Sequence, residues 1–258
     1  MRIIRYRDVE GHDRYGIVEG DRAYRAEGEP FSQHGLRRGV ELGPAAALTL
    51  LPPVVPGKIV CVGLNYAAHV TENDPSRVVP DEPVLFMKPP SALIGAGQAI
   101  VIAHPDHRTD YEAELAIVIG RQGRAIAEAD APAFILGYTC GNDVSDRTLQ
   151  KKDGQWVRAK GFDTYCPLGP WIETDFDPSD RAVVSRRNGD TKQSQRTSAM
   201  IFKPAFLVSF ISDVMTLEPG DVILTGTPEG VGPMQPGDLI EVEIEGIGVL
   251  ANPVVAAS

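Results

Sequence analysis

The chain has 258 residues, with 25 Lys and Arg against 35 Asp and Glu, so its net charge is −10. Hydrophobic residues make up 43% and charged residues 23%, which are ordinary values for a globular protein and exclude a disordered chain. The acidic balance argues against nucleic-acid binding, and no apolar run approaches the ~18 residues of a membrane span. The three scattered cysteines form no disulfide framework, and the N-terminus lacks the apolar stretch of a signal peptide, so we expect a cytoplasmic protein.

The N-terminal part of the chain predicts a small β-region. Residues 1–24 alternate and contain Gly-rich turns, which is typical of two or three short strands. Residues 51–57 (Leu-Pro-Pro-Val-Val-Pro-Gly) cannot continue a strand or a helix, because three of these residues are proline. We therefore expect an N-terminal β-region over residues 1–55 and a main domain over residues 56–258.

The main domain is predicted to be mainly β with few helices. Apolar runs predict strands at residues 58–63, 84–87, 99–102, 110–120, 221–225, 238–244 and 247–250. Helical spacing occurs at residues 66–71, 127–136 and 202–215. The last of these is the clearest helix, since its apolar residues form one stripe and Pro204 stands in the first turn.

Three acids mark the beginning of the strand predicted at residues 110–120. Side chains alternate along a strand, so Asp110, Glu112 and Glu114 share one face, which continues as apolar residues. Carboxylates on a face that is otherwise buried repel one another and lose hydration, and a divalent cation would relieve both costs. The alternative is a solvated strand entry, which the pattern alone leaves open.

A second acidic segment could complete such a site. Residues 138–147 predict a strand that runs into a polar turn carrying Asp143 and Asp146. Asn-Asp after Gly is by itself more typical of a turn or a helix cap. Oxygen ligands alone suit Mg²⁺ or Mn²⁺, with Ca²⁺ as a further possibility, and disfavour zinc and iron.

Other polar residues suggest catalysis or substrate binding, each with an ordinary structural alternative. His69 and Glu72 lie three residues apart on the predicted turn of helix, where a carboxylate can orient an imidazole as a general base. Their alternative is a surface ion pair. Lys160 lies in a Gly- and Pro-rich loop and would matter only if it faced the metal. Residues 225–232 form a Gly-rich loop that could bring the Thr227 hydroxyl to an anion, although they match no phosphate-loop pattern.

Taken together, these segments resemble the fumarylacetoacetate hydrolase family. The resemblance rests on Gly63-Leu64-Asn65-Tyr66 with His69 and Glu72, on Asp110-Tyr111-Glu112-Ala113-Glu114-Leu115-Ala116, on Gly141-Asn142-Asp143-Val144, on Lys160-Gly161-Phe162-Asp163 and on the run from Leu217 to Pro233. Their order and spacing match over residues 57–253. We expect the branch that resembles 2-hydroxyhepta-2,4-diene-1,7-dioate isomerases and acylpyruvases.

The resemblance implies a mixed β-sandwich or roll, a homodimer, and a site that holds Mg²⁺, Mn²⁺ or Ca²⁺. It implies metal ligands at Glu112, Glu114 and Asp143. It also implies a water-activating or proton-moving dyad of His69 and Glu72 on a lid, with Lys160 near the metal-bound oxyanion. The implied substrate-binding residues are Arg147, Gln150 and Thr227.

One departure from the family pattern affects the pocket. Many relatives have Ala-Arg-Asp where this chain has Asp146-Arg147-Thr148, so the acid precedes the arginine instead of following it. This change puts the polarity of the pocket, and thus the identity of the substrate, in question. Asp110 is a candidate for supporting the metal site rather than a ligand.

We expect a metal-dependent hydrolase or isomerase that acts on a small 2-oxo or 2,4-dioxo acid, or its enol, through a metal-stabilised enolate. An oxaloacetate-type decarboxylase or tautomerase of the same family is the alternative. A catalytically silent metal-binding relative and a partner-binding β-protein with surface carboxylates are the rivals from other classes. The partner-binding protein would show no stabilisation by divalent metal.

Overall fold

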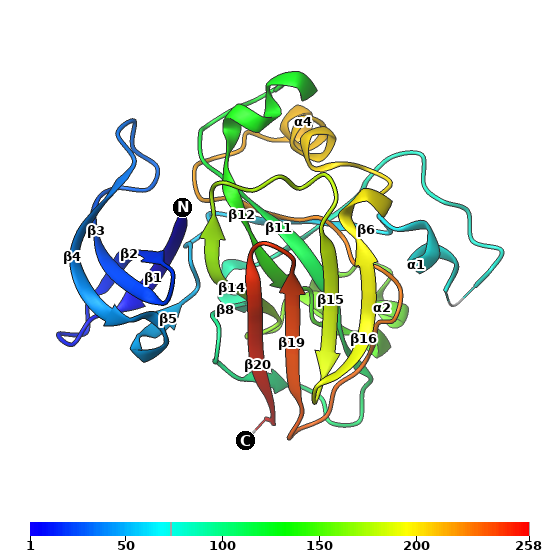
Figure 1. Ribbon diagram of the computed structural model, residues 1–258. Helices are drawn as coiled ribbons and strands as arrows, with labels where there is room; N and C mark the ends of the chain where they lie inside the picture. Colours follow the sequence, from blue (N-terminus) through cyan, green and yellow to red (C-terminus); the bar gives the residue numbers. More distant parts are fainter. Residues whose placement is uncertain (73, 258) are drawn as a thin grey trace.

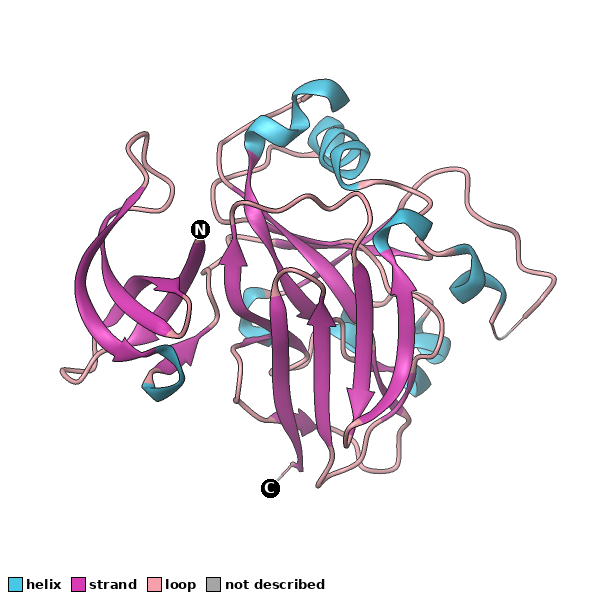
Figure 2. Ribbon diagram, in the orientation of Figure 1, coloured by secondary structure: helices cyan, strands magenta, loops and turns pink. Residues whose placement is uncertain are grey.

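The computed structural model describes residues 1–72 and 74–257, and β-strands dominate it (Figures 1 and 2). The strands are β1 (Arg2–Arg7), β2 (Asp13–Glu19), β3 (Arg22–Gly28), β4 (Leu36–Pro44), β5 (Thr49–Leu51), β6 (Ile59–Gly63), β7 (Val84–Lys88), β8 (Leu93–Ile94), β9 (Ile100–Ile102), β10 (Thr109–Tyr111), β11 (Ala113–Ile119), β12 (Ile135–Asn142), β13 (Ser145–Asp146), β14 (Cys166–Glu173), β15 (Ala182–Arg187), β16 (Asp190–Arg196), β17 (Val222–Leu224), β18 (Gly232–Pro233), β19 (Leu239–Ile244) and β20 (Gly248–Ala256). The α-helices are α1 (Ala67–Thr71), α2 (Arg147–Asp153), α3 (Val157–Lys160) and α4 (Pro204–Val214). The predicted mainly β fold is confirmed.

The strands form three sheets. The largest runs in the order β4-β3-β2-β1-β14-β12-β11-β17-β6-β7, with β5 paired to β1 and β8 paired to β14. A second sheet runs β16-β15-β19-β20-β9, and Figure 1 shows its strands in front of β11 and β12. A small sheet, β13-β10-β18, lies beside the acidic residues discussed below.

Strand β11 forms the centre of the core, and both of its faces are buried, as the sequence predicted. One face carries Leu115 and Ile117, which pack with Val242 of β19 and Leu207 of α4. The opposite face carries Val118, in a second cluster that also contains residues of β6, β14 and β17. Such a strand excludes water along its whole length, so a charged side chain at its end must be paired inside the protein.

The predicted strand over residues 110–120 is interrupted at Glu112, which corrects the expectation of one continuous face. The amide of Glu112 donates to the side chain of Asn142 at 2.9 Å, and its carbonyl accepts from the amide of Asp143 at 3.0 Å. These bonds replace regular strand pairing, so the chain leaves the small sheet after β10 and enters the large sheet at β11. As a result, Asp110 is separated from Glu112 and Glu114.

The predicted helix over residues 127–136 is also wrong in type. Residues Glu128–Phe134 form a 3₁₀ helix that contains Pro132, and β12 begins at Ile135. Proline lacks the amide that a longer α-helix needs, so the segment stays tight and short. The helix predicted at residues 202–215 is confirmed as α4, with Pro204 in its first turn.

The N-terminal strands join the large sheet, because β1 pairs with β14 at Arg2–Glu173 and Ile3–Ile172. No strand or helix lies between β5 and β6, where the prolines of residues 52–56 occur. The division into domains at residues 55 and 56 stays a prediction.

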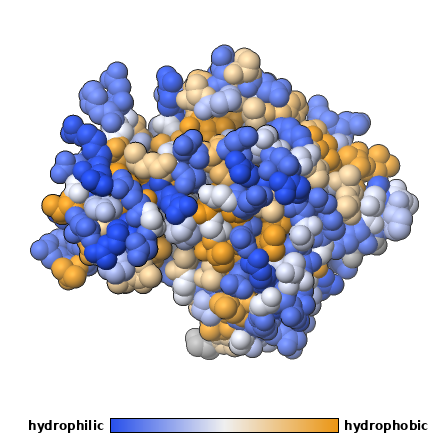
Figure 3. All heavy atoms as spheres, viewed as in Figure 1, coloured by the Kyte–Doolittle hydropathy of each residue, from blue (hydrophilic) through white to orange (hydrophobic). Residues whose placement is uncertain are grey.

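Figure 3 shows hydrophilic and hydrophobic residues intermixed on the viewed face. None of the helices described is long and apolar enough to span a bilayer.

Candidate active site

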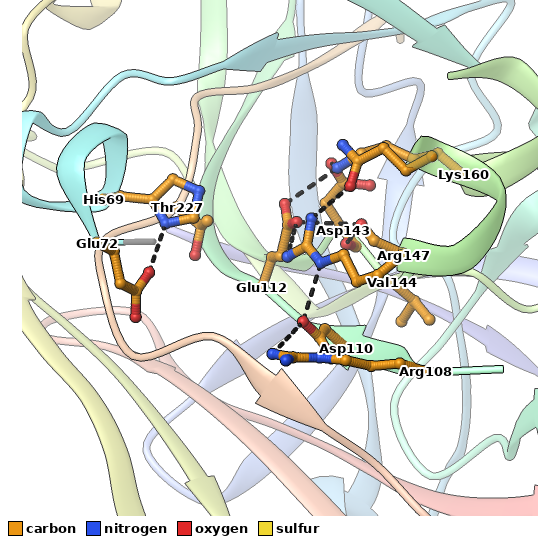
Figure 4. Close-up of polar contacts among 12 residues, drawn as sticks. His69, Glu72, Arg108, Asp110, Glu112, Asp143, Val144, Arg147, Lys160 and Thr227 are labelled. Carbon is orange, nitrogen blue, oxygen red and sulfur yellow. Dashed lines mark hydrogen bonds and ion pairs between the residues drawn. The ribbon is translucent and has the colours of Figure 1, made fainter. Parts of the chain in front are cut away.

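Two adjoining cavities gather every site residue that the sequence predicted except Glu72, which contacts His69. The inner cavity measures about 30 Å³ and is lined by the three predicted metal ligands together with His69, Arg147, Gln150, Lys160 and Thr227. The outer cavity measures about 400 Å³. Both are lined by Leu64, His69, Arg147, Gln150 and Trp156, so they are continuous. Segments far apart in the sequence therefore meet at one place (Figure 4).

Glu112, Glu114 and Asp143 form a buried group of carboxylates. Each offers an oxygen, and these oxygens lie within 4.8 Å of one another. Glu114 is the second residue of β11, and Asp143 directly follows β12. The two strands pair next to these residues, because Glu114 is opposite Gly141. Asp110 lies outside this group and instead accepts from Arg108 at 2.8 Å and from Arg147 at 2.9 Å.

Two cations stabilise two of these carboxylates. Lys160 Nζ lies 3.1 Å from Glu112 Oε2 and 2.5 Å from Asp143 Oδ2, and Arg147 Nη2 lies 2.6 Å from Glu112 Oε1. Burial raises the pKa of Glu112, but Lys160 and Arg147 outweigh it, so this pKa lies below its ordinary value. Burial lowers the pKa of Lys160, yet the adjacent carboxylates raise it on balance, so Lys160 is charged.

Glu114 differs from the other two carboxylates. Among the residues described, its one hydrogen-bond donor is the amide of Gly226, 2.7 Å from Oε2. Burial, followed by the charges of Asp143 and Glu112, holds the pKa of Glu114 well above its usual value. The ionised form is thus poorly compensated within the protein. An oxygen-only donor set with one uncompensated carboxylate fits a hard divalent cation such as Mg²⁺, Mn²⁺ or Ca²⁺.

A buried lysine that no motif in the sequence marked completes the charge pattern. Lys88 ends β7 and is 1% exposed. Its Nζ lies 2.7 Å from Asp143 Oδ1 and donates to the carbonyls of Val144, Lys160 and Tyr165. The contact with Asp143 is close but lies outside hydrogen-bond geometry, so it is an ion pair rather than a directed bond. One lysine thus links the turn after β12 to the end of α3.

Replacing Lys88 by methionine is expected to lower the free energy of unfolding by about 3–5 kcal/mol, because it removes one of the two cations beside the buried Asp143 and a donor to three buried carbonyls. Denaturant unfolding of the metal-free protein measures this loss. Lys192→Met removes an exposed pair with Asp190 and should cost about 0–1 kcal/mol. Equal effects of the two substitutions would contradict the role of Lys88.

His69 of α1 lines both cavities and forms a hydrogen-bonded pair with Glu72, the residue that follows this helix. His69 Nδ1 lies 3.0 Å from Glu72 Oε2, and the amide of Gly230 donates to Glu72 Oε1 at 2.7 Å. The Glu72 carboxylate can only accept, so His69 Nδ1 carries the proton and donates it to this bond. Nε2 is therefore the basic nitrogen of the ring. Asn65 anchors the start of this segment, since its side chain bonds the carbonyls of Phe202 and Thr225.

Helix α2 presents Arg147 and Gln150 on one face. All three guanidinium nitrogens of Arg147 are engaged: Nε with Asp110, Nη1 with Gln150 Oε1 at 2.8 Å, and Nη2 with Glu112. The Gln150 carbonyl is therefore used, and its amide NH₂ is left to donate. Nη2 lies outside hydrogen-bond geometry with Glu112, so this contact is an ion pair, and Arg147 cross-links the site through these contacts.

The acid that precedes Arg147 has a structural use. Asp146 Oδ1 accepts from the amide of Leu149 at 3.0 Å and caps α2, while Oδ2 lies 2.6 Å from His107 Nδ1. Asp146 lines neither cavity. The departure from the family pattern therefore anchors the helix that carries Arg147 and does not add a negative charge to the pocket.

Thr227 follows β17 and lines the inner cavity. Its Oγ1 accepts from Gln193 Nε2 at 2.8 Å, which leaves the hydroxyl hydrogen available for a ligand. Gln193 also accepts from the amide of Ala113, so it connects the Gly-rich loop to the start of β11. No signal in the sequence marked Gln193, because a glutamine on a polar strand is ordinary.

Two family profiles match the chain. The profile described as fumarylacetoacetate (FAA) hydrolase C-terminal matches residues 58–255. The chain belongs to this family. A second profile, described as Rv2993c-like, N-terminal, matches residues 1–53.

Solved structures of this family resemble the chain over its whole length. 5-Carboxymethyl-2-hydroxymuconate delta-isomerase from Mycobacterium smegmatis is 46% identical, with a TM-score of 0.89 and coverage of 100% of both chains. 2-Hydroxyhepta-2,4-diene-1,7-dioate isomerase from Mycobacterium marinum is 44% identical, with a TM-score of 0.89 and coverage of 100% of this chain and 99% of that one. The mitochondrial oxaloacetate tautomerase Fahd2a of Rattus norvegicus is 39% identical over 236 residues, which cover 87% of this chain and 75% of the relative. The predicted branch is thus confirmed.

Proposed function

We propose that this member of the fumarylacetoacetate hydrolase family is a metal-dependent hydrolase or isomerase of a small 2-oxo or 2,4-dioxo acid or its enol. The observation that carries the proposal is that His69, which is paired with Glu72, lines the same cavity as the three carboxylates. A general base beside a cation site with oxygen ligands can transfer a proton at a carbon next to a carbonyl.

Glu112, Glu114 and Asp143 would hold Mg²⁺ or Mn²⁺, with Ca²⁺ as an alternative. When bound, the cation would act as a Lewis acid toward the 2-oxo acid and stabilise its enolate. Lys160 adds a buried positive charge beside the same oxygens. We propose that the Gln150 amide and the Thr227 hydroxyl donate to the substrate, while Arg147 holds Glu112 and Gln150 in position.

In C–C hydrolysis, His69 Nε2 removes a proton from water, and the hydroxide adds to the carbonyl distal to the 2-oxo group. The bond between that carbonyl and the methylene carbon breaks, and the electron pair passes to the methylene carbon as the enolate of the 2-oxo acid. The proton then returns from His69 to this carbon. Glu72 stabilises the imidazolium while His69 holds the proton.

In isomerisation, the same nitrogen removes a proton from one carbon of the substrate and returns it to another, with no water consumed. The names of the two mycobacterial isomerases and of the rat tautomerase support proton transfer as a second activity to assay. Hydrolysis adds water to a carbonyl, whereas isomerisation moves a proton from one carbon to another. Both reactions use His69 as the base.

The deciding experiment follows the ultraviolet absorbance of the acetylpyruvate enol with purified protein in Mg²⁺ and in EDTA. We expect loss of absorbance that depends on Mg²⁺, with acetate and pyruvate as the hydrolysis products. If acetylpyruvate is stable, the tautomerisation and the decarboxylation of oxaloacetate are assayed under the same conditions. Failure of all these reactions in Mg²⁺ and Mn²⁺ would contradict the proposal and favour a silent metal-binding relative.

A further inference from the structure

A second group of metal-binding side chains lies outside both cavities. His104, His107 and Asp146 each offer a ring nitrogen or a carboxylate oxygen, and these atoms lie within 4.8 Å of one another. None of the three residues lines the inner or the outer cavity, so the group is separate from the three carboxylates of the candidate active site. It also differs from them in chemistry, because two of its three donors are imidazoles.

A tight turn between β9 and β10 brings the two histidines together. The amide of His107 donates to the carbonyl of His104 at 3.0 Å, and Pro105 occupies the second position of the turn, which its fixed φ favours. The centroids of the two imidazole rings lie 4.6 Å apart. The exposed His104 also packs edge-on against Phe162, with ring centroids 5.4 Å apart. The turn therefore holds the two imidazoles next to each other.

Asp146 reaches the same place from a different segment. It precedes α2 and pairs with Thr109 across the small sheet. Its Oδ2 lies 2.6 Å from His107 Nδ1, whereas its Oδ1 accepts from the amide of Leu149. The side chain of Asp146 is fully buried, so it presents a carboxylate oxygen to the histidines from a fixed position.

We propose that His104, His107 and Asp146 bind a divalent transition-metal ion, with Zn²⁺ as the expected occupant. Imidazole and carboxylate donors suit such ions, whereas Mg²⁺ and Ca²⁺ take oxygen ligands. Donors around a tetrahedral Zn²⁺ lie about 3.4 Å apart for bonds of about 2.1 Å, so a rotation of the exposed His104 ring closes the group. The ion takes the place of the hydrogen between His107 Nδ1 and Asp146, and the ring proton moves to Nε2. Water completes the coordination.

The ion would tie the turn at residues 104–107 to the beginning of α2. The two segments are already joined beside the group, since the amide of Arg147 donates to the carbonyl of Arg108 at 2.8 Å. An ion that binds only the folded chain stabilises it. The site does not depend on the proposed function, because its donors belong to neither cavity.

The test is calorimetric titration of the purified protein with Zn²⁺ in excess Mg²⁺. We expect the wild type to bind a Zn²⁺ ion whose affinity falls more than about 10-fold in His104→Ala and in Asp146→Asn. Asparagine also caps helices, so the second variant tests the carboxylate while the start of α2 is kept. Titration with Co²⁺ gives a second readout, because its visible absorption reports nitrogen ligation and should weaken in His107→Ala.

Two controls separate this ion from others. His34→Ala removes an exposed histidine outside the group and should titrate like the wild type. Glu114→Gln alters the carboxylates of the candidate active site and should keep this Zn²⁺ ion. Unchanged Zn²⁺ affinity in both His104→Ala and Asp146→Asn, or loss of all Zn²⁺ binding in Glu114→Gln, would overturn the inference. Neither result bears on turnover of an oxo acid, which the assay with acetylpyruvate measures separately.

Discussion

Glu114→Ala is expected to reduce the affinity for Mn²⁺ by more than about 100-fold, the upper end of the effect of replacing residues that merely support metal ligands. Glu114 is the carboxylate that the protein compensates least, since Gly226 is its one donor among the described residues. Its charge is therefore available to a cation. Calorimetric titration with Mn²⁺ measures the loss, and an unchanged titration would remove Glu114 from the proposed ligands.

A second variant at this position guards against a general folding defect. Glu114→Gln keeps the shape of the side chain and should also lose Mn²⁺ binding. Glu243→Gln is the control, because Glu243 pairs with Arg186 on the second sheet and should bind Mn²⁺ like the wild type.

Glu114→Gln should also change how the free energy of unfolding depends on pH. Burial and the neighbouring acids raise the folded-state pKa of Glu114 above its ordinary value of 4.5. A raised folded-state pKa stabilises the fold below the unfolded-state value, and this contribution is lost as the pH rises. Without metal, Glu114→Gln should therefore gain stability relative to the wild type as the pH increases above 4.5. A difference that is constant with pH would contradict the raised pKa.

His69→Ala is expected to lower kcat by about 10²–10⁴-fold, the usual contribution of a positioned general base. The Mn²⁺ affinity should stay within about twofold of the wild type, because His69 contacts Glu72 rather than the carboxylate group. Steady-state kinetics at saturating metal, combined with Mn²⁺ titration, separate the two quantities.

The control for His69 is His34→Ala, which changes an exposed histidine of the N-terminal region and should not affect kcat. Retained turnover in His69→Ala would remove this residue from the mechanism. Loss of turnover together with loss of metal affinity would instead indicate that α1 has a structural role at the site.

Much of the fold could be predicted from local patterns. Apolar residues on both faces of the strand expected at residues 110–120 predicted burial on both sides, and β11 contributes residues to two separate core clusters. The apolar stripe with Pro204 in the first turn predicted α4. These predictions succeed because side-chain periodicity depends on a few consecutive residues. The spacing of His69 and Glu72 likewise predicted a pair that forms within one helical turn.

The tertiary structure decided which charges meet. In the sequence, Lys88 is an ordinary lysine at the end of a predicted strand. In the structure it is buried against Asp143, because β7 pairs with β6 and contacts α3. The interruption at Glu112 depends on Asn142, which lies 30 positions away in the chain. The roles of Asp146 as a helix cap and of Arg147 as a cross-link depend on neighbours from β10 and α2.

The sequence by itself therefore determined the family, the mainly β architecture and the residue types of the site, because each depends on short motifs or on local periodicity. Only the tertiary structure decided how the charges of Glu112, Glu114 and Asp143 are balanced, and which cations lie against them. The physical reason is that Coulomb interactions and desolvation depend on distances in space and on burial, and both are set by the packing of segments that are remote in sequence.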